Sequence, residues 1–278
     1  MNRAPIISLT TDFGVSGPYV GAMRGVLLSR CPSARLVDIT HRIPPHDVLA
    51  GAFVLAAAAP WFPDGTIHLA VVDPGVGGVR RALVVQTHRQ LYVGPDNGLF
   101  TAILDREPRA ALYAIDRSRL GLMEAHPTFH GRDLFAPVAA ELASGLEPSR
   151  VGERVSDPVR GWSAGPRACG PDGSLELRVL DVDRFGNVTT DLTREILSAT
   201  TGDSMGEAVW IARGGRPAVR ARCVATYAES EGDELLALWG SSSYLELAVN
   251  RGRADRTLGV ARGDRIGLRV SGPRGGAP

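Results

Sequence analysis

Short apolar runs alternate with longer segments of helical spacing in the first half of the chain. Strands are predicted at residues 6–9, 35–39, 66–72, 82–87 and 90–93, and helices at residues 17–30, 47–59, 97–104 and 132–143. Strands that alternate with helices are typical of a parallel sheet. The pattern therefore predicts an α/β domain over residues 1–146, with a largely parallel central sheet and flanking helices.

The pattern changes twice after residue 146. Residues 147–173 are rich in Pro, Gly and Ser, which is typical of a linker with surface loops. From residue 174 the apolar positions follow a period of two, and strands are predicted at residues 174–183, 208–212, 218–224, 235–238, 245–249 and 265–270. Many short strands indicate a smaller all-β domain, barrel-like or sandwich-like, over residues 174–270. Residues 271–278 are predicted to form a disordered tail.

Composition narrows the range of functions. The 278 residues are 44% hydrophobic and 22% charged, which suffices for one or two packed domains. Because 31 basic residues balance 30 acidic ones, the chain lacks the charge excess of a typical nucleic-acid binder, and we expect no such partner. All 31 basic residues are arginine, which excludes a phosphate-loop lysine, a Schiff-base lysine and a pyridoxal phosphate anchor.

The spacing of the cysteines and the lengths of the apolar runs indicate in which cellular compartment the protein is expected. Cys31, Cys169 and Cys223 are odd in number and far apart, so they match neither a zinc-binding spacing nor a CxxC motif. The most apolar stretch, residues 48–62, has about fifteen residues, fewer than the roughly twenty that span a bilayer. The first residues show no secretory signal. We therefore expect a cytoplasmic protein with no membrane contact and no metal site.

Two motifs that follow predicted strands carry acidic residues. Asp12 stands in TTDFG, residues 10–14, where a carboxylate can accept both hydroxyls of a ribose; the alternative is a cap on the turn before the helix. Asp73 opens DPGVGGVRR, residues 73–81, and Arg80 could fold back to pair with it. The alternative here is a plain Pro-Gly turn with solvated arginines. Neither motif matches the dinucleotide fingerprint or the Walker phosphate loop.

Two further motifs carry groups suited to proton transfer or base recognition. His130 in FHGRD, residues 129–133, precedes a helix whose positive N-terminal dipole favours the neutral imidazole; the alternative is a capping loop with a surface histidine. In DRFGNVTT, residues 183–190, Phe185 can stack on a base and Asn187 can pair with a purine edge. The alternative for this motif is a β-turn between two strands.

The motifs are more specific together than singly. TTDFG, DPGVGxxRR, GPDNGLF at residues 94–100, FHGRDxFAP and DxFGNxxT occur in this order from about residue 6 to about residue 264. This combination resembles the SAM (S-adenosyl-L-methionine) hydroxide adenosyltransferases, the adenosine-forming SAM hydrolases related to fluorinase and chlorinase. The resemblance implies an α/β domain, a β-barrel-like domain and a homotrimer, with each SAM site between the first domain of one subunit and the second domain of its neighbour.

The resemblance also implies an enzyme activity. Water or hydroxide attacks C5′ of the SAM ribose and releases adenosine and L-methionine. Because the leaving group is a neutral thioether, we expect no metal and no cofactor beyond the substrate. The family's catalytic triad matches Asp73, Arg80 and His130. Asp73 would orient or deprotonate the water, Arg80 would keep Asp73 ionised, and His130 would complete the water's hydrogen bonds or relay its proton; which residue takes the proton stays open.

The substrate contacts implied by the resemblance lie in both predicted domains. Asp12 matches the ligand of the ribose diol, and His46 stands where halogenating relatives carry a tryptophan against the ligand. Asp183 matches the carboxylate that binds the methionine ammonium group, while Phe185 and Asn187 match adenine contacts. Further methionine and adenine contacts are expected within residues 241–251, for which we select Ser242, Asn250 and Arg251.

Two alternatives compete with hydrolysis. In a halogenase the position of Asp73 holds a phenol and the FHGRD segment carries hydroxyl or small groups, whereas an anionic Asp73 repels halide and Gly131 offers no hydroxyl. A catalytically idle SAM or adenosine sensor would retain Asp12, Phe185 and Asn187 but lose the triad, and all three triad residues are present. The sequence therefore favours SAM hydrolysis.

Overall fold

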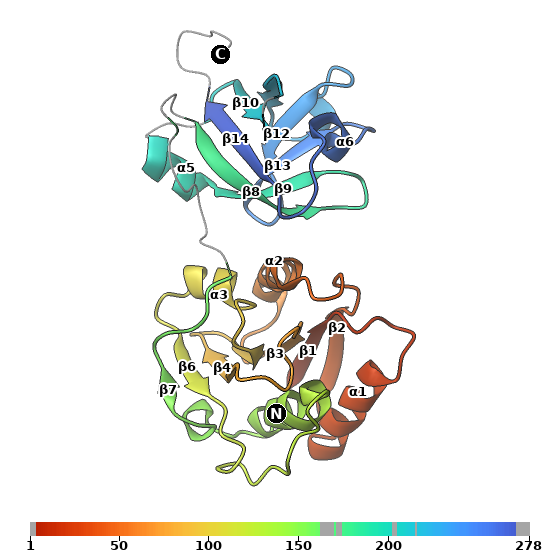
Figure 1. Ribbon diagram of the computed structural model, residues 1–278, viewed down its shortest axis with the longest axis vertical. Helices are drawn as coiled ribbons and strands as arrows, with labels where there is room; N and C mark the ends of the chain where they lie inside the picture. The colour runs from red at the N-terminus through yellow and green to blue at the C-terminus, as the bar shows by residue number, and fades with distance from the viewer. Residues whose placement is uncertain (1–3, 162–169, 171–173, 202–204, 215, 271–278) are drawn as a thin grey trace. The chain divides into compact units, whose positions relative to one another are not determined.

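The computed structural model describes residues 4–161, 170, 174–201, 205–214 and 216–270. The chain divides into two compact units, Met1–Trp162 and Ser163–Pro278 (Figure 1). The division falls inside the segment 147–173, and the tail expected at 271–278 lies outside the described residues.

Within the described residues, the first unit is built on a seven-stranded sheet with the strand order β2-β1-β3-β5-β4-β6-β7. Its strands are β1 (Ile6–Thr11), β2 (Arg35–Thr40), β3 (Ile67–Val71), β4 (Ala82–Gln86), β5 (Leu91–Pro95), β6 (Ala111–Ala114) and β7 (Arg154–Val155). Strands β2, β1, β3 and β5 pair in parallel, whereas β4, β6 and β7 add antiparallel pairs. The sheet is therefore mixed, and the prediction of a largely parallel sheet holds for only one part of it.

The antiparallel part of the sheet has a local cause. The turn at His88-Arg89 joins β4 directly to β5, where the Thr87 N–H donates to the Gln90 carbonyl at 3.0 Å. Strands joined by so short a turn run antiparallel. The sequence pattern does not predict β6 or β7, because β6 has four residues with only Leu112 buried and β7 has two.

Helices cover both faces of this sheet. They are α1 (Tyr19–Arg30), α2 (Val48–Ala58), α3 (Thr101–Arg106) and α4 (Ala136–Ala143). Helices α1 and α4 pack on one face, around Leu9 and Leu69, whereas α2 and α3 lie on the other (Figure 1). The helix predicted at 132–143 begins as a π-helical turn, η2 (Gly131–Phe135), before it continues as α4. Such turns occur often at functional sites.

One histidine is enclosed in this unit. His68 on β3 has no exposed surface, and its ring stacks on Tyr92 with 4.9 Å between centroids. Its Nδ1 lies 2.6 Å from Ser8 Oγ. Burial disfavours the imidazolium form and lowers the pKa of His68 from 6.5 to about 4. The fold therefore holds this ring neutral.

We expect His68 to make the fold sensitive to acid. Its neutral form is favoured in the folded state, so its contribution is complete above pH 6.5 and is lost as the pH falls towards 4. The lowered pKa corresponds to about 3 kcal/mol of unfolding free energy. Urea unfolding at about pH 7.5 and about pH 4.5 should show a smaller acid loss for His68→Gln than for wild type. An equal loss in both proteins would contradict this assignment.

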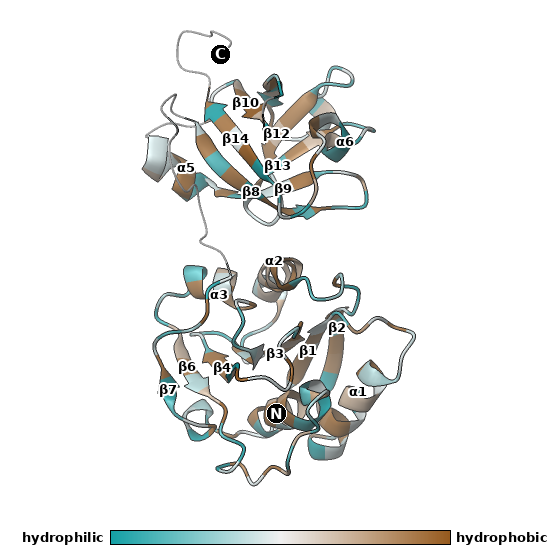
Figure 2. Cartoon of the chain, viewed as in Figure 1, coloured by the Kyte–Doolittle hydropathy of each residue, from teal (hydrophilic) through white to brown (hydrophobic). Residues whose placement is uncertain are grey.

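Within the described residues, the second unit is a closed barrel with the strand order β10-β11-β12-β13-β9-β8-β14, which confirms the predicted barrel-like domain. Its strands are β8 (Leu175–Val182), β9 (Val188–Thr193), β10 (Ala208–Ala212), β11 (Val219–Cys223), β12 (Leu235–Trp239), β13 (Tyr244–Val249) and β14 (Arg265–Val270), with helices α5 (Arg194–Thr201) and α6 (Ala254–Leu258). Alternate residues of β8, such as Leu175, Leu177 and Val179, fill its core. In Figure 2 many residues along these strands have the brown colour of hydrophobic residues. The strands predicted from the period of two do not include β9, whose VTTDLT sequence is mostly polar.

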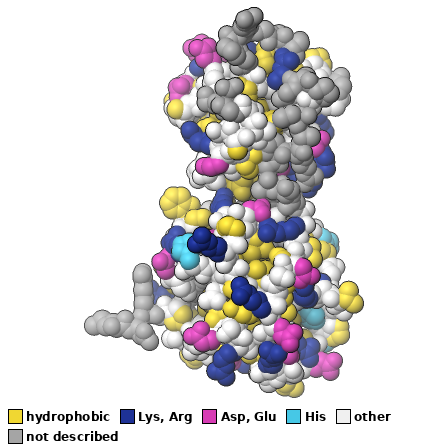
Figure 3. Space-filling view, turned by 90° about the vertical axis from the view of Figure 1, so that its left-hand side faces the viewer, with side chains coloured by type: hydrophobic (Ala, Val, Ile, Leu, Met, Phe, Trp, Pro, Cys, Tyr) yellow, Lys and Arg dark blue, Asp and Glu magenta, His cyan; other side chains and the backbone are white. Residues whose placement is uncertain are grey.

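On the face shown in Figure 3, arginine and acidic side chains are interspersed. Among the helices of the described ranges, none is both long enough and apolar enough to cross a bilayer.

Candidate active site

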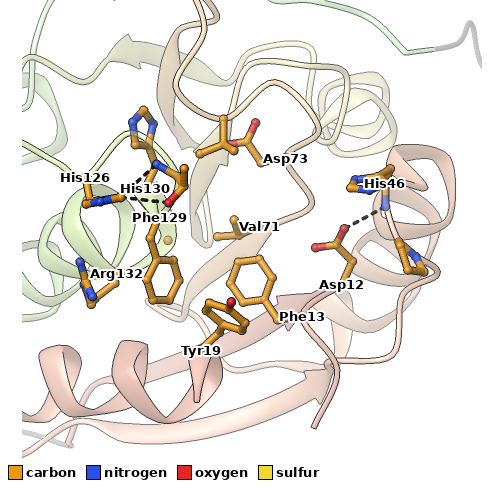
Figure 4. A pocket seen from close by; sticks show the side chains of 14 residues that line it. Asp12, Phe13, Tyr19, His46, Val71, Asp73, His126, Phe129, His130 and Arg132 are labelled. Carbon is orange, nitrogen blue, oxygen red and sulfur yellow. Dashed lines mark hydrogen bonds between the residues drawn. The ribbon is translucent and has the colours of Figure 1, made fainter. Parts of the chain in front are cut away.

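A cavity of about 540 Å³ opens in the first unit at the carboxyl ends of β1 and β3 (Figure 4). Asp12 follows β1 and Asp73 follows β3, and the parallel pairing of these strands brings both carboxylates to one edge of the sheet. His46 enters from the loop before α2, and His130 from the loop before η2. Residues that lie far apart in the sequence thus line a single cavity.

Asp73, Arg80 and His130 form one connected group. Arg80 Nε donates to Asp73 Oδ1 at 2.9 Å and Nη2 donates to Asp73 Oδ2, so the guanidinium grips both carboxylate oxygens. Arg80 Nη2 also donates to His130 Nδ1 at 2.8 Å. The side chain of Asp73 is 4% exposed and that of Arg80 is 11% exposed, so this ion pair is weakly screened by water. The pairing of Arg80 with Asp73 predicted from the sequence is present.

His130 is held in one protonation state. Because Nδ1 accepts from Arg80, the neutral ring carries its proton on Nε2. Burial, and then the Arg80 cation, lower the pKa of His130 below its usual value. The sequence points to a helix dipole as the cause of neutrality, whereas the structure supplies burial and a cation. His130 is thus a neutral hydrogen-bond donor at physiological pH.

A glycine permits the loop of Asp73 and Arg80 to meet the loop of His130. Gly77 has φ +76°, and a Cβ at this position would lie 2.5 Å from the Pro127 carbonyl oxygen. Pro127 lies three residues before His130, so this contact joins the two loops. Only a residue without a side chain allows so close an approach. Gly77 of the DPGVGG sequence therefore allows the loop of Asp73 to contact the loop of His130.

Asp12 is anchored beside the cavity by His46. The His46 backbone N–H donates to Asp12 Oδ2 at 2.9 Å. His46 has φ +67°, a left-handed conformation that is unfavourable for a residue with a side chain. The His46 ring lies at the cavity wall beside Asp12, on the side away from His130 (Figure 4).

In the barrel, Asp183 organises a tight turn between β8 and β9. Its Oδ1 accepts from the backbone N–H groups of Phe185 at 2.8 Å and of Asn187 at 2.9 Å, and its Oδ2 accepts from Asn187 Nδ2 at 3.1 Å. The turn projects Phe185, which is 67% exposed, with the Arg184 guanidinium 5.7 Å from its ring centroid. The β-turn weighed as an alternative for this motif is therefore present, and it displays an aromatic ring.

The segment 241–251 does not form one compact cluster. Asn250 and Arg251 follow β13 at the end of the barrel that carries the Asp183 turn, where the Asp255 N–H donates to the Gly186 carbonyl at 3.0 Å. Ser242 lies in the turn before β13, at the opposite end of this strand. Six residues of strand span about 20 Å, so Ser242 lies apart from the other selected residues.

Family models match both units. The SAM hydroxide adenosyltransferase N-terminal domain matches residues 7–152, and the C-terminal domain of the same family matches residues 177–267. The chain belongs to the SAM hydroxide adenosyltransferase family. Asp73, Arg80 and His130 lie within the N-terminal match, and the turn at Asp183 lies within the C-terminal match.

Members of this family and their relatives are similar over most of the chain. A protein of Thermus thermophilus named (R)-S-adenosyl-L-methionine hydrolase is 42% identical over 262 residues, covering 91% of this chain and 95% of the relative. One of the same name from Salinispora tropica is 40% identical, covering 96% and 98%. A fluorinase of Actinoplanes is 27% identical and covers 69% and 73%. A crystal structure of an uncharacterized conserved protein from Thermotoga maritima superposes with a TM-score of 0.82 at 35% identity, covering 94% and 99%.

The structure adds an aromatic wall that the sequence analysis misses. Phe13, Tyr19 and Phe129 all line the cavity, with 5.9 Å between the centroids of Phe13 and Phe129 and 5.2 Å between those of Tyr19 and Phe129. Phe13 follows Asp12 in TTDFG, and Phe129 precedes His130 in FHGRD. This adjacency to site residues is the signal in the sequence that indicates their place at the cavity. Among the described residues, no group of three or more His, Cys, Asp or Glu side chains is placed to hold a metal ion.

Proposed function

We propose that this chain hydrolyses SAM to adenosine and L-methionine. The observation that carries the proposal is the connected group of Asp73, Arg80 and His130, of which Asp73 and His130 line the cavity. Its volume of about 540 Å³ lies within the range of about 300–1,000 Å³ typical of small-molecule sites. Relatives at 33–42% identity that carry the name (R)-S-adenosyl-L-methionine hydrolase support the same conclusion.

In the proposed reaction a water oxygen attacks C5′ of the ribose, on the side opposite to sulfur. The new C–O bond forms as the C–S bond breaks, and its electron pair returns to the positively charged sulfur, which leaves as the neutral thioether of methionine. The leaving group therefore needs no acid and no metal. The task left to the protein is to hold one water in line with the C–S bond and to accept its proton.

We assign the acceptance of this proton to Asp73. His130 Nδ1 already accepts a hydrogen bond from Arg80, and the Nε2–H can only donate. Asp73 is the remaining acceptor of the connected group, and both of its carboxylate oxygens accept hydrogen bonds from Arg80. His130 would then donate its Nε2–H to the water oxygen, which fixes the direction of the oxygen lone pair. This assignment is our proposal for the question that the sequence leaves open.

The remaining substrate contacts divide between the two units. Asp12 would accept the ribose hydroxyls, with His46 and the aromatic wall beside the sugar. Phe185 and Asn187 would contact adenine, and the Asp183 carboxylate would attract the methionine ammonium group. Asn250 and Arg251 would supply further contacts, whereas Ser242, at the opposite end of β13, is not among them. We propose that the units meet in a homotrimer, so that the cavity of one subunit is completed by the barrel of its neighbour.

Hydrolysis is better supported than halogenation. An ionised Asp73 beside the reaction centre repels fluoride or chloride, and this repulsion is strong where little water screens it. The fluorinase relatives are 26–28% identical over about 70% of the chain, below the identity and coverage of the hydrolases. A sensor without catalysis would have no use for the three connected triad side chains. We also propose that the enzyme works in the cytoplasm, since its three cysteines are odd in number and far apart in the sequence.

A single assay tests this function. Purified protein incubated with SAM should release adenosine and methionine in equal amounts, and addition of EDTA should leave the rate unchanged, because no step uses a metal. Chromatography with mass detection measures both products. Intact SAM after prolonged incubation would overturn the proposal, and 5′-chloro-5′-deoxyadenosine formed in chloride buffer would favour a halogenase.

A further inference from the structure

The motif GPDNGLF has no role in the chemistry proposed so far, yet it lies directly beside the catalytic loop. Its residues Asp96 and Asn97 leave the carboxyl end of β5. In the sheet β5 lies between β3, which leads into Asp73, and β4, which follows Arg80. The loop 73–81 therefore has to pass across the end of β5, where Asp96 and Asn97 emerge.

Asn97 holds the first end of this loop. Its Nδ2 donates to the carbonyl of Val72 at 2.9 Å, and Val72 is the residue before Asp73. Its Oδ1 accepts from the Leu99 N–H at 3.3 Å, which orients the amide. One side chain thus ties the start of the loop to the turn after β5.

Asp96 holds the second end. Its side chain is 2% exposed, and its Oδ2 accepts from Arg81 Nε at 2.7 Å, while its backbone N–H donates to the Arg81 carbonyl at 3.0 Å. Asp96 Oδ1 accepts from the Val159 N–H at 2.8 Å, so the carboxylate is itself fixed from the other side. Arg81 directly follows Arg80.

We infer that Asp96 and Asn97 are a pair of positioning residues that fasten both ends of the 73–81 loop and so keep Asp73 and Arg80 aligned with His130. The inference rests on the proposed function, since its purpose is to align a water-activating group. Neither residue lines the cavity, and both act through the backbone or through Arg81. Displacement of a catalytic group by about 1 Å can lower a rate by about 100-fold, so two anchors are expected to matter.

The test compares two variants of Asn97 with a matched control. Asn97→Ala removes both hydrogen bonds, whereas Asn97→Asp retains the acceptor for Leu99 and removes only the bond to Val72. The control is Gln90→Ala, because the Gln90 amide also donates to backbone carbonyls, those of Ala59 and Phe62 at 2.9 and 3.0 Å. Gln90 precedes β5 and so lies at the opposite end of that strand.

Both Asn97 variants should lower kcat for SAM hydrolysis by about 10-fold and change KM by less than about 2-fold, because the loop moves while the binding residues stay. The pKa of His130, followed by the NMR signal of its C2 proton, should rise in Asn97→Ala as Arg80 moves away from the ring. Gln90→Ala should lower the melting temperature and leave kcat and the His130 pKa unchanged.

The NMR titration separates this inference from the proposed function, since it needs no turnover of SAM. An unchanged His130 pKa in Asn97→Ala would overturn the inference, whatever the activity. A normal kcat in Asn97→Ala together with a low kcat in Asn97→Asp would show an effect of the new charge and would equally overturn it. A fall in kcat of the same size in Gln90→Ala would show that general destabilisation is the cause.

Discussion

Asp73→Asn is expected to lower kcat for SAM hydrolysis by about 100-fold or more, with a change in KM of less than about 3-fold. The amide keeps the shape of the carboxylate and its oxygen can still accept one of the two hydrogen bonds from Arg80, but it cannot take a proton from water. Because Asp73 is placed to act on water and not on the substrate, binding of SAM should persist. Initial rates of adenosine release over a range of SAM concentrations measure both constants.

A contrasting variant makes this result specific. Asp12→Ala removes the proposed partner of the ribose hydroxyls, so it should raise KM by about 10-fold or more. Its effect on kcat should be smaller than that of Asp73→Asn. Turnover at the wild-type rate in Asp73→Asn would show that the proton acceptor is misassigned. A large rise in KM for Asp73→Asn with kcat unchanged would instead place Asp73 among the binding residues.

Mixed assemblies of the proposed homotrimer are expected to be more active at low SAM concentration than either parent. The parents are Asp73→Asn, altered in the first unit, and Phe185→Ala, altered in the barrel. Phe185 is a suitable choice because it is mostly exposed, whereas Asp183 also holds its turn together. Loss of stacking on adenine should cost about 1–3 kcal/mol of binding, so each parent is weak at low SAM concentration.

In a trimer with sites between subunits, about one third of the sites of each mixed trimer combine an unaltered first unit with an unaltered barrel. Co-expression with two different tags and purification on both isolates these trimers, and their rate at low SAM concentration is the measurement. The control pairs Asp73→Asn with Asp12→Ala, which are altered in the same unit and leave no intact site. Absence of recovery in the first mixture, with mixed trimers present, would exclude a site shared in this way, and a monomeric chain in sedimentation would exclude the trimer.

Several site residues can be predicted from sequence because their signal is local. Asp12 and Asp73 directly follow apolar strands, and the parallel pairing of β1 with β3 brings their carboxylates to one edge of the sheet. The contact between Arg80 and His130 joins residues 50 positions apart, and neither strand periodicity nor motif spacing encodes it. The same holds for Asn97 and Val72, whose contact depends on β5 lying beside β3.

The sequence by itself determined the two-part composition of the chain, most of its strands and helices, and its family, because burial periodicity and long ordered motifs are properties of the linear chain. Tertiary structure alone decided the mixed direction of the first sheet, the short strands β6 and β7, the aromatic wall and the contact of His130 with Arg80. These features depend on which strands become neighbours and on which side chains, far apart in the sequence, come into contact. Because the chain contains no lysine, the cation of the triad is an arginine, Arg80. The order of the strands in the sheet decides which side chains Arg80 contacts.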